Sequence, residues 1–215
     1  ESGRSAEALS HIEKLLASAP PTPEPYLLLI RQQQLAGVEP QRSLEVLLQG
    51  VERFPESAEL HVALGKQFIA SGRAEEAERV LRTAIRLKPD SSEPAALIGA
   101  LMVGTGRFKE ALPLYEALCN SEAATGESHL ILGGIYSALE RPDEALAEWN
   151  RAVALDPQLA DGHLQLARAY AERHDRERSL KSYKRFLYLA EKNPTKVEVP
   201  EGIQEEIMRV STGAP

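Results

Sequence analysis

The sequence is poor in the residues that would cross-link a fold or carry it through a membrane. Its 215 residues include a single cysteine, Cys119, which excludes an internal disulfide framework and a zinc site built from several cysteines. No apolar run approaches the roughly 18 residues of a membrane span. Positive charge is also in deficit, because 25 Lys and Arg face 32 Asp and Glu, for a formal net charge of −7. We therefore expect no transmembrane segment and no nonspecific binding to nucleic acid.

Aromatic residues are scarce as well, at 5% of the chain, although hydrophobic residues make up 43%. The second figure excludes wholesale disorder, and the shortage of rings predicts a core of leucine and alanine between closely packed helices. The sequence starts at Glu1 without a methionine or a signal peptide. We therefore expect a processed form or a fragment, so that a cytoplasmic location and an exported bacterial lipoprotein both stay open.

The sequence does contain a repeat with a period of 34 residues. Prolines close three of the units, at Pro55, Pro89 and Pro157, whereas the unit between the last two has Ala123 at that position. Small and large residues recur at the same step in five columns, which are Gly65, Gly99, Gly133 and Ala167; Leu64, Ile98, Leu132 and Leu166; Phe68, Met102, Tyr136 and Tyr170; Ala77, Ala111, Ala145 and Ser179; and Leu81, Tyr115, Trp149 and Tyr183.

Within each period the apolar residues fall at spacings of three, four and seven, which predicts two helices packed against each other. Gly133 lies on the packing face, although glycine costs a helix roughly 1 kcal/mol relative to alanine. We interpret Gly133 as a residue that lets the second helix approach closely, with the large Trp149 filling the space. The Gly133–Gly134 pair is therefore not expected to form an active site.

These small, aromatic and proline columns resemble the tetratricopeptide repeat (TPR) family over nearly the whole chain. The resemblance implies an all-α fold, namely a right-handed α-solenoid of TPR helix pairs with a C-terminal capping helix. The expected divisions are a partial repeat that supplies only a second helix (1–23), five repeats (24–57, 58–91, 92–125, 126–159 and 160–193), and an extended linker, capping helix and tail (194–215).

Two of these repeats depart from the pattern. In the first full repeat, which is degenerate, Arg31 occupies the glycine column and Gly50 replaces an alanine, so we expect this helix pair to splay. In the third repeat, Pro113 lies inside the second helix, which it should kink or delay. Pro40 and Pro142 fall instead in the first turn of second helices, where the missing N–H does no harm.

The segment after the last repeat predicts a cap. Two prolines in 193–201 favour an extended connection, and Ile203, Ile207 and Val210 then form a stripe on a short helix. A helical array needs such an element to cover its last apolar face. The other end begins inside a repeat without a cap, so we expect either that the array continues upstream or that a partner or a second copy covers that end.

No motif in the sequence predicts a catalytic or metal site. The glycines of 104–109 fall at a turn between two helices, whereas a phosphate-binding loop follows a strand. Cys119 and His129 have nothing nearby in the sequence to orient them as nucleophile and base. His61, His129 and His163 share one column, but equivalent positions of successive repeats lie on the order of 10 Å apart, too far for a common metal ion. We expect neither an enzyme nor a cofactor.

A second stripe follows the first helix of each repeat, at its fifth, ninth and twelfth positions. By resemblance to TPR proteins, this stripe lines a concave groove, and its apolar middle suits an amphipathic helix or an extended segment of a partner. The alternative is that these residues only pack neighbouring first helices together, which we weigh equally for Ala96, Ala100 and Gly134. The groove positions are Leu28, Gln32, Leu35, Val62, Lys66, Ile69, Ala96, Ala100, Val103, Leu130, Gly134, Ser137, Leu164, Arg168 and Ala171.

Acidic residues recur at the second position of the first helices. They form an acidic rim that pairs with basic groups of a partner, or they serve only the helix N-termini, where the dipole favours negative charge. The acidic rim consists of Glu59, Glu93, Glu127 and Asp161.

The last repeat carries the opposite charge. Segment 172–196 holds eight Lys and Arg against four Asp and Glu, or +4, which leaves −11 for the rest of the chain. Four of these cations share one helix face, which is either a docking patch for an acidic partner or a solvated surface. This basic patch consists of Arg178, Lys181, Lys184 and Arg185.

TPR proteins that grip a C-terminal carboxylate carry asparagine at the ninth position, with lysine and arginine around it. The corresponding column here is Gln32, Lys66, Ala100, Gly134 and Arg168, so this clamp does not transfer. We predict a noncatalytic adaptor or scaffold that binds a peptide or helix in the groove. The alternatives are a bacterial assembly factor, such as a lipoprotein of pilus, secretion or polymer-export machinery, and the recognition arm of a larger enzyme.

Overall fold

The structure, a computed structural model, describes residues 21–35 and 40–213 and assigns the chain to two compact units. The first unit ends at Thr105 and the second begins at Gly106. Every regular element of the described residues is a helix. The partial repeat predicted for 1–23 falls almost entirely outside these residues.

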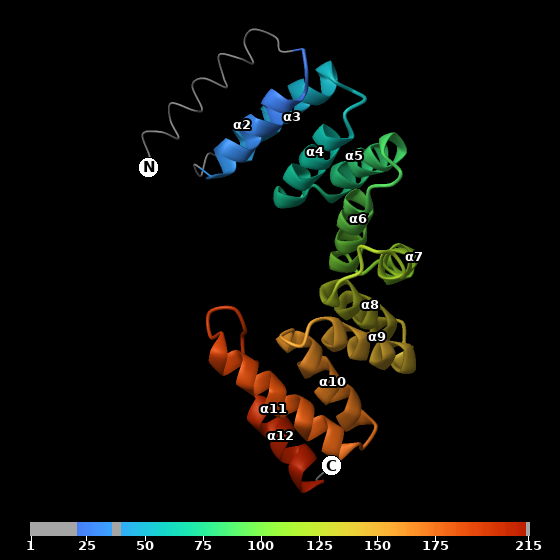
Figure 1. Cartoon of the computed structure of the whole chain (residues 1–215), viewed down its shortest axis with the longest axis vertical. Helices are drawn as coiled ribbons and strands as arrows, with labels where there is room; N and C mark the ends of the chain where they lie inside the picture. The colour runs from blue at the N-terminus through green and yellow to red at the C-terminus, as the bar shows by residue number, and fades with distance from the viewer. Residues whose placement is uncertain (1–20, 36–39, 214–215) are drawn as a thin grey trace. The chain divides into compact units, whose positions relative to one another are not determined.

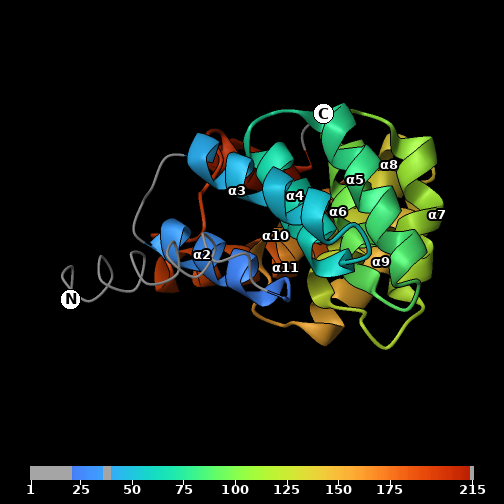
Figure 2. The same cartoon turned by 90° about the horizontal axis from the view of Figure 1, so that it is seen from above.

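Unit 1 contains five described helices (Figure 1). Consecutive helices pack against each other, and α4 also contacts α2 and α6. Figure 2 shows α4 and α5 side by side. The bounds are α2 Glu24–Leu35, α3 Pro40–Arg53, α4 Ala58–Ala70, α5 Ala74–Leu87 and α6 Ser92–Gly104.

Unit 2 is built in the same way and ends on a shorter helix. Each of its helices packs against the next helix along the chain. Among the helices that the structure describes, none combines the length and the apolar character that a membrane span requires. The predicted all-α solenoid fold, made of helix pairs, is confirmed. The bounds are α7 Phe108–Cys119, α8 Gly126–Ala138, α9 Pro142–Leu155, α10 Ala160–Glu172, α11 Arg176–Lys192 and α12 Ile203–Thr212.

The repeated glycines lie where two helices of a pair meet. Gly65, Gly99 and Gly133 are all buried. A Cβ atom on Gly65 would lie 2.6 Å from the side chain of Leu81, and one on Gly133 would overlap the indole ring of Trp149. Real Cβ atoms essentially never come this close to a neighbour. The interpretation of the glycine column as a packing device is therefore confirmed.

The degenerate first repeat places its small residue on the other helix. Gly50 lies in α3, and a Cβ atom there would lie 3.0 Å from Cδ1 of Tyr26 in α2. Tyr26 is buried, whereas Arg31, in the glycine column of α2, is exposed. Arginine cannot be packed against a partner helix as glycine can, so the close contact of this pair forms at Gly50.

The prolines act as the sequence predicts at the helix starts and differently inside α7. Pro40 begins α3 and Pro142 begins α9. The delay predicted for Pro113 is wrong, because α7 begins at Phe108, one period before Pro142, and continues through Pro113 to its end. Pro113 is exposed, so the carbonyl group of Lys109, which loses its helical donor, can bond to water.

The turns between the two helices of a repeat contain a column that the sequence analysis did not identify. Gly72, Gly106, Glu140 and His174 follow one another at the 34-residue step and all have positive φ, of 70°, 73°, 59° and 57°. Side chains other than glycine seldom adopt this left-handed conformation. Glu140 and His174 therefore occupy a turn position that favours glycine.

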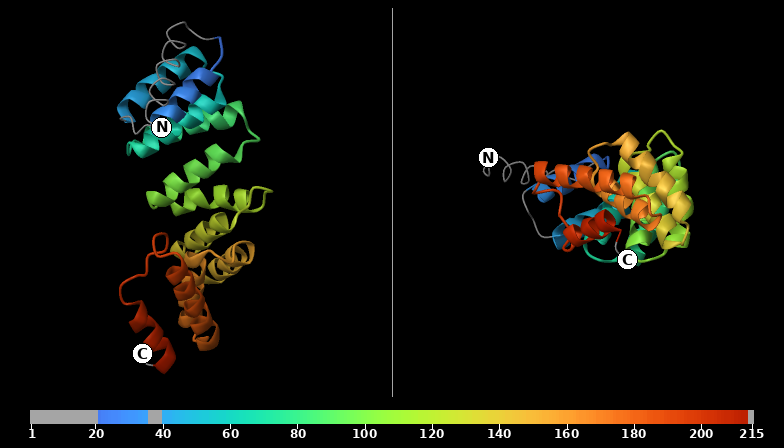
Figure 3. Two further views of the ribbon diagram at one scale, coloured as in Figure 1. Left: turned by 60° about the vertical axis from the view of Figure 1, so that its left-hand side comes forward. Right: turned by 90° about the horizontal axis from the view of Figure 1, so that it is seen from below.

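Helix α12 covers the end of unit 2 beside α11, as the views in Figure 1 and Figure 3 agree. Ile203 is 3% exposed, and Ile207 and Val210 pack against the same core cluster, which includes Tyr183 and Phe186. The apolar stripe of α12 therefore lies against the last repeat.

A charged network fastens α12 to α10 and α11. The Arg168 guanidinium donates two hydrogen bonds to Glu206, Nε to Oε2 at 3.0 Å and Nη2 to Oε1 at 2.9 Å. The Tyr183 hydroxyl donates to Oε2 at 2.9 Å. The hydrogen bond from Arg168 lowers the pKa of Glu206, while burial and the Glu206 carboxylate raise the pKa of Tyr183 to about 12.

Gly133→Ala should lower the free energy of unfolding by about 1–3 kcal/mol, because the new methyl group overpacks against Trp149. Gly134→Ala is the matched control, since a Cβ atom there meets open space. The control should gain up to about 1 kcal/mol from helix propensity. Urea unfolding followed by fluorescence of Trp149, the single tryptophan, measures both, and equal effects of the two changes would contradict close packing at Gly133.

Glu206→Gln should destabilise unit 2 at neutral pH by roughly 1 kcal/mol, because it weakens a partly exposed ion pair. The folded-state pKa of Glu206 lies below its ordinary value of 4.5. The stabilisation is therefore present above that value and disappears as the pH falls through the lowered pKa. Unfolding at neutral and acidic pH, measured through Trp149, should show the variant and the wild type converging in acid, and a constant difference would refute this role of Glu206.

Candidate partner-binding site

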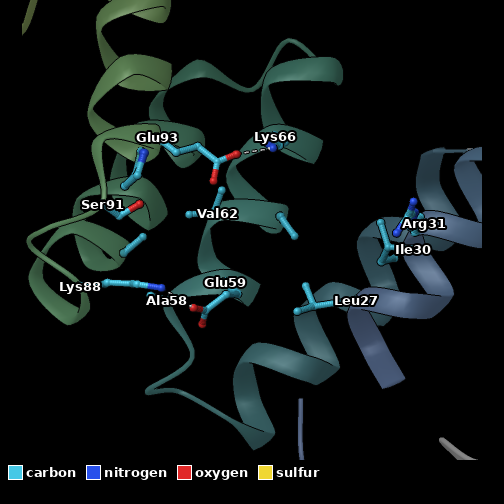
Figure 4. Close-up of a pocket in the computed structure, with 13 residues that line it drawn as sticks. Leu27, Ile30, Arg31, Ala58, Glu59, Val62, Lys66, Lys88, Ser91 and Glu93 are labelled. Carbon is cyan, nitrogen blue, oxygen red and sulfur yellow. Dashed lines mark hydrogen bonds and ion pairs between the residues drawn. The ribbon is translucent and has the colours of Figure 1, made fainter. Parts of the chain in front are cut away.

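A pocket of about 290 Å³ lies in unit 1 between α2, α4 and the region where α5 ends and α6 begins (Figure 4). Helices α2 and α4 are first helices of neighbouring repeats, and two of the predicted groove residues, Val62 and Lys66, line the pocket. The apolar residues that line it are Leu27, Ile30, Val62, Ala63, Ala58, Ala84 and Pro94.

Two ion pairs flank Val62 at the pocket (Figure 4). Nζ of Lys66 lies 2.6 Å from Oε1 of Glu93, and Nζ of Lys88 lies 3.1 Å from Oε1 of Glu59. All four side chains are at least half exposed, so each pair contributes only about 0–1 kcal/mol to stability. These charges are therefore available to a partner at little cost to the fold.

The pKa of the Glu59 carboxyl is lowered, first by a hydrogen bond from backbone near the start of α4 and second by Lys88. The backbone hydrogen bond agrees with the helix N-terminus interpretation of the acidic rim at Glu59, whereas pairing with a partner stays a prediction. The structure also brings Glu93 into the same pocket, whereas Glu127 and Asp161 belong to unit 2 and are exposed there.

The lining residues of α2 differ from those expected. The pocket is lined by Leu27, Ile30 and Arg31, and not by the predicted Leu28, which is 46% exposed outside it. Arg31, which occupies the glycine column of this repeat, is exposed and lines the pocket itself. The departure of Arg31 from the repeat pattern was the signal in the sequence that could have located these residues.

The other groove positions of unit 1 do not line this pocket. Ile69 and Ala100 are exposed, and Ala96 and Val103 are half-buried. Gln32 is half-buried, and the side chain of Leu35 lies outside the described part of the chain. Among the predicted groove residues of unit 1, Val62 and Lys66 are the two that the pocket brings together.

In unit 2 the groove prediction is wrong for Leu164. Its side chain is 5% exposed and belongs to the core with Tyr183 and Phe186, because the apolar face of α10 is covered by α11 and α12. Gly134 and Ser137 are exposed and Leu130 is half-buried. The remaining groove positions of this unit, Arg168 and Ala171, line a second pocket against α12.

The basic patch is divided between paired and unpaired cations. Arg178 forms an ion pair with Asp175 at 2.6 Å and stacks on Tyr170. Arg185 donates to the backbone carbonyl of Pro157. Lys181 and Lys184 are exposed, and neither has an ion-pair partner among the described residues.

His129 has an orienting partner that the sequence analysis missed. Its Nδ1 lies 2.6 Å from Oε2 of Glu148, both side chains are buried, and Glu148 also pairs with Arg151. The statement that nothing orients His129 is therefore wrong, since the fold brings together residues 19 apart in sequence. Burial raises the pKa of the Cys119 thiol, however, which disfavours the thiolate that a nucleophile requires.

The other two histidines of the column bond to the backbone. His61 donates from Nδ1 to the carbonyl oxygen of Ser57 at 2.9 Å. Nε2 of His163 lies 3.2 Å from the carbonyl oxygen of Pro157. No group of three or more His, Cys, Asp or Glu residues in the described ranges could hold a metal ion.

Comparison with known structures shows the same fold in several TPR proteins. A MamA RS-1 double mutant has a TM-score of 0.74 at 19% identity, and the aligned region covers 81% of this chain and 97% of the MamA chain. MamA from residue 41 to its end, from Desulfovibrio magneticus RS-1, has a TM-score of 0.69 at 19% identity. The aligned region covers 83% of this chain and 99% of that chain. YrrB, a TPR protein with an unusual peptide-binding site, has a TM-score of 0.69 at 19% identity. The aligned region covers 86% of this chain and 93% of the YrrB chain.

Sequence comparison agrees with the repeat period. No curated protein sequence matches the chain. Residues 39–101 match a family model described as tetratricopeptide repeat, and residues 133–173 match a second one described as TPR repeat. The chain therefore contains tetratricopeptide repeats, with a match in each unit, and it shares the fold of TPR proteins.

Proposed function

We propose that this protein is a noncatalytic scaffold that binds a segment of a partner protein in the pocket of unit 1. One observation carries the proposal: a single pocket combines apolar lining residues with two exposed ion pairs, Lys66–Glu93 and Lys88–Glu59. The peptide-binding site of YrrB, which shares the fold, supports the same kind of function.

The size and lining of the pocket favour one inserted side chain. A volume of about 290 Å³ lies at the lower end of the range for ligand pockets, roughly 300–1,000 Å³. It accommodates an aliphatic side chain against Val62 and Ile30, while the rest of the segment lies across the rim. There the ammonium groups of Lys66 and Lys88 and the carboxylates of Glu59 and Glu93 can bond to its polar groups.

The charges of the pocket suit binding better than catalysis. Both lysines are paired with carboxylates, and the lowered pKa of Glu59 keeps this carboxyl ionised. A general acid or base at neutral pH needs a pKa near 7, so Glu59 is shifted in the unfavourable direction. The proposed scaffold therefore has no catalytic role for this residue.

Ala63→Leu should weaken peptide binding by about tenfold or more, because the larger side chain enters the pocket and displaces the inserted group. Ala70→Leu is the matched control, since the same substitution falls on the same helix at an exposed position outside the pocket. Leucine and alanine are both good helix formers, so both variants should keep their circular dichroism.

The ligands for this test are peptides selected from a displayed random library against the full chain. Their affinities for the wild type and both variants are measured by fluorescence anisotropy. The proposal predicts a loss with Ala63→Leu alone. Peptides that bind Ala63→Leu as tightly as the wild type would place the binding surface elsewhere.

A further inference from the structure

Unit 2 has a pocket of its own, of about 800 Å³, between α10, the start of α11 and α12. It is separate from the pocket of unit 1 and shares no residue with it. Part of its lining is apolar, from Ala171, Val210 and the ring of Tyr183, and the rest is strongly polar. Its volume is large enough for several residues of a peptide.

One wall of this pocket already binds a carboxylate. Arg168 holds Glu206 with two hydrogen bonds, and Tyr183 adds a third. This arrangement joins α10 and α11 to α12, and it neutralises the charges of Arg168 and Glu206. The Arg168–Glu206 pair therefore adds no net charge to the pocket.

Two other arginines line the pocket without such a partner. Arg176, the first residue of α11, and Arg209 of α12 are both exposed. Within the described residues, neither guanidinium has a hydrogen bond or an ion pair, although Arg209 lies near enough to lower the pKa of Glu206. A guanidinium matches a carboxylate with two parallel hydrogen bonds. The remaining lining carboxylate, Glu172, leaves an excess of one positive charge, in a chain whose net charge is −7.

The preceding repeat shows that the fold does not require Arg176 at the start of α11. Arg176 and His174 line the pocket, and the residues one period earlier are Pro142 and Glu140. Pro142 begins α9 as Arg176 begins α11, and Glu140 adopts the same left-handed turn as His174. The same local structure thus forms without an arginine at the start of the helix, so this turn and helix start do not depend on Arg176.

We propose that this pocket of unit 2 binds an acidic segment of a partner protein, whose Asp and Glu side chains pair with Arg176 and Arg209. The methylene groups of these side chains lie against Ala171 and Val210. The positive excess of the pocket, its two unpaired guanidiniums and its volume all match such a segment. The site does not depend on the function proposed for unit 1.

Arg176→Gln/Arg209→Gln should weaken binding of an acidic peptide by about tenfold or more, because two charge-assisted contacts are lost. The probe is a fluorescent hexaglutamate peptide with both ends blocked, titrated into the full chain at physiological ionic strength. Lys181→Gln/Lys184→Gln is the matched control, because it removes two exposed charges from α11 that do not line the pocket. The control should bind the probe as the wild type does.

Three further measurements complete the test. An Ala63→Leu chain should bind the hexaglutamate peptide normally, which separates this site from the pocket of unit 1. A blocked hexaglutamine peptide should not bind. A hexaglutamate peptide with a free C-terminal carboxylate should bind no better than the blocked hexaglutamate peptide. The proposal is overturned if the wild type shows no saturable binding, if the control loses as much affinity as the arginine variant, or if the free C-terminus accounts for binding.

Discussion

The close approach of two helices at a glycine sets the geometry of the repeats that contain Gly65 and Gly133. In unit 2, Gly133 leaves room for the indole of Trp149, and in unit 1, Gly65 leaves room for Leu81. A glycine inside a helix costs backbone entropy, and dense contact between the helices offsets that cost. Because this contact is inside each pair, the other faces of the first helices remain available to neighbouring repeats and to a partner.

The first repeat shows what happens when this constraint is met in another way. With arginine in the glycine column, the close contact forms at Gly50 against Tyr26. From the same helix pair, Leu27, Ile30 and Arg31 line the pocket. The residue that departs from the packing pattern, Arg31, is therefore also part of the pocket lining.

The two pockets combine apolar and charged groups in different ways. In unit 1 the charges at the pocket are largely paired with each other around an apolar lining, whereas in unit 2 one ion pair is part of the architecture and two arginines are left over. The buried His129–Glu148 pair belongs to neither pocket. It is a structural contact between α8 and α9, and it satisfies polar groups that would be costly to bury alone.

The sequence by itself determined the helix pairs, their period and the packing role of the glycines, because these depend on local spacing and on residue size within one repeat. It also indicated the face on which Val62, Lys66, Glu59 and Glu93 meet. Only the tertiary structure decided which residues of α2 line the pocket, that α12 buries Leu164, and that Glu148 orients His129. These outcomes depend on how one helix is turned against the next and on contacts between residues far apart in the chain, which a 34-residue period does not encode.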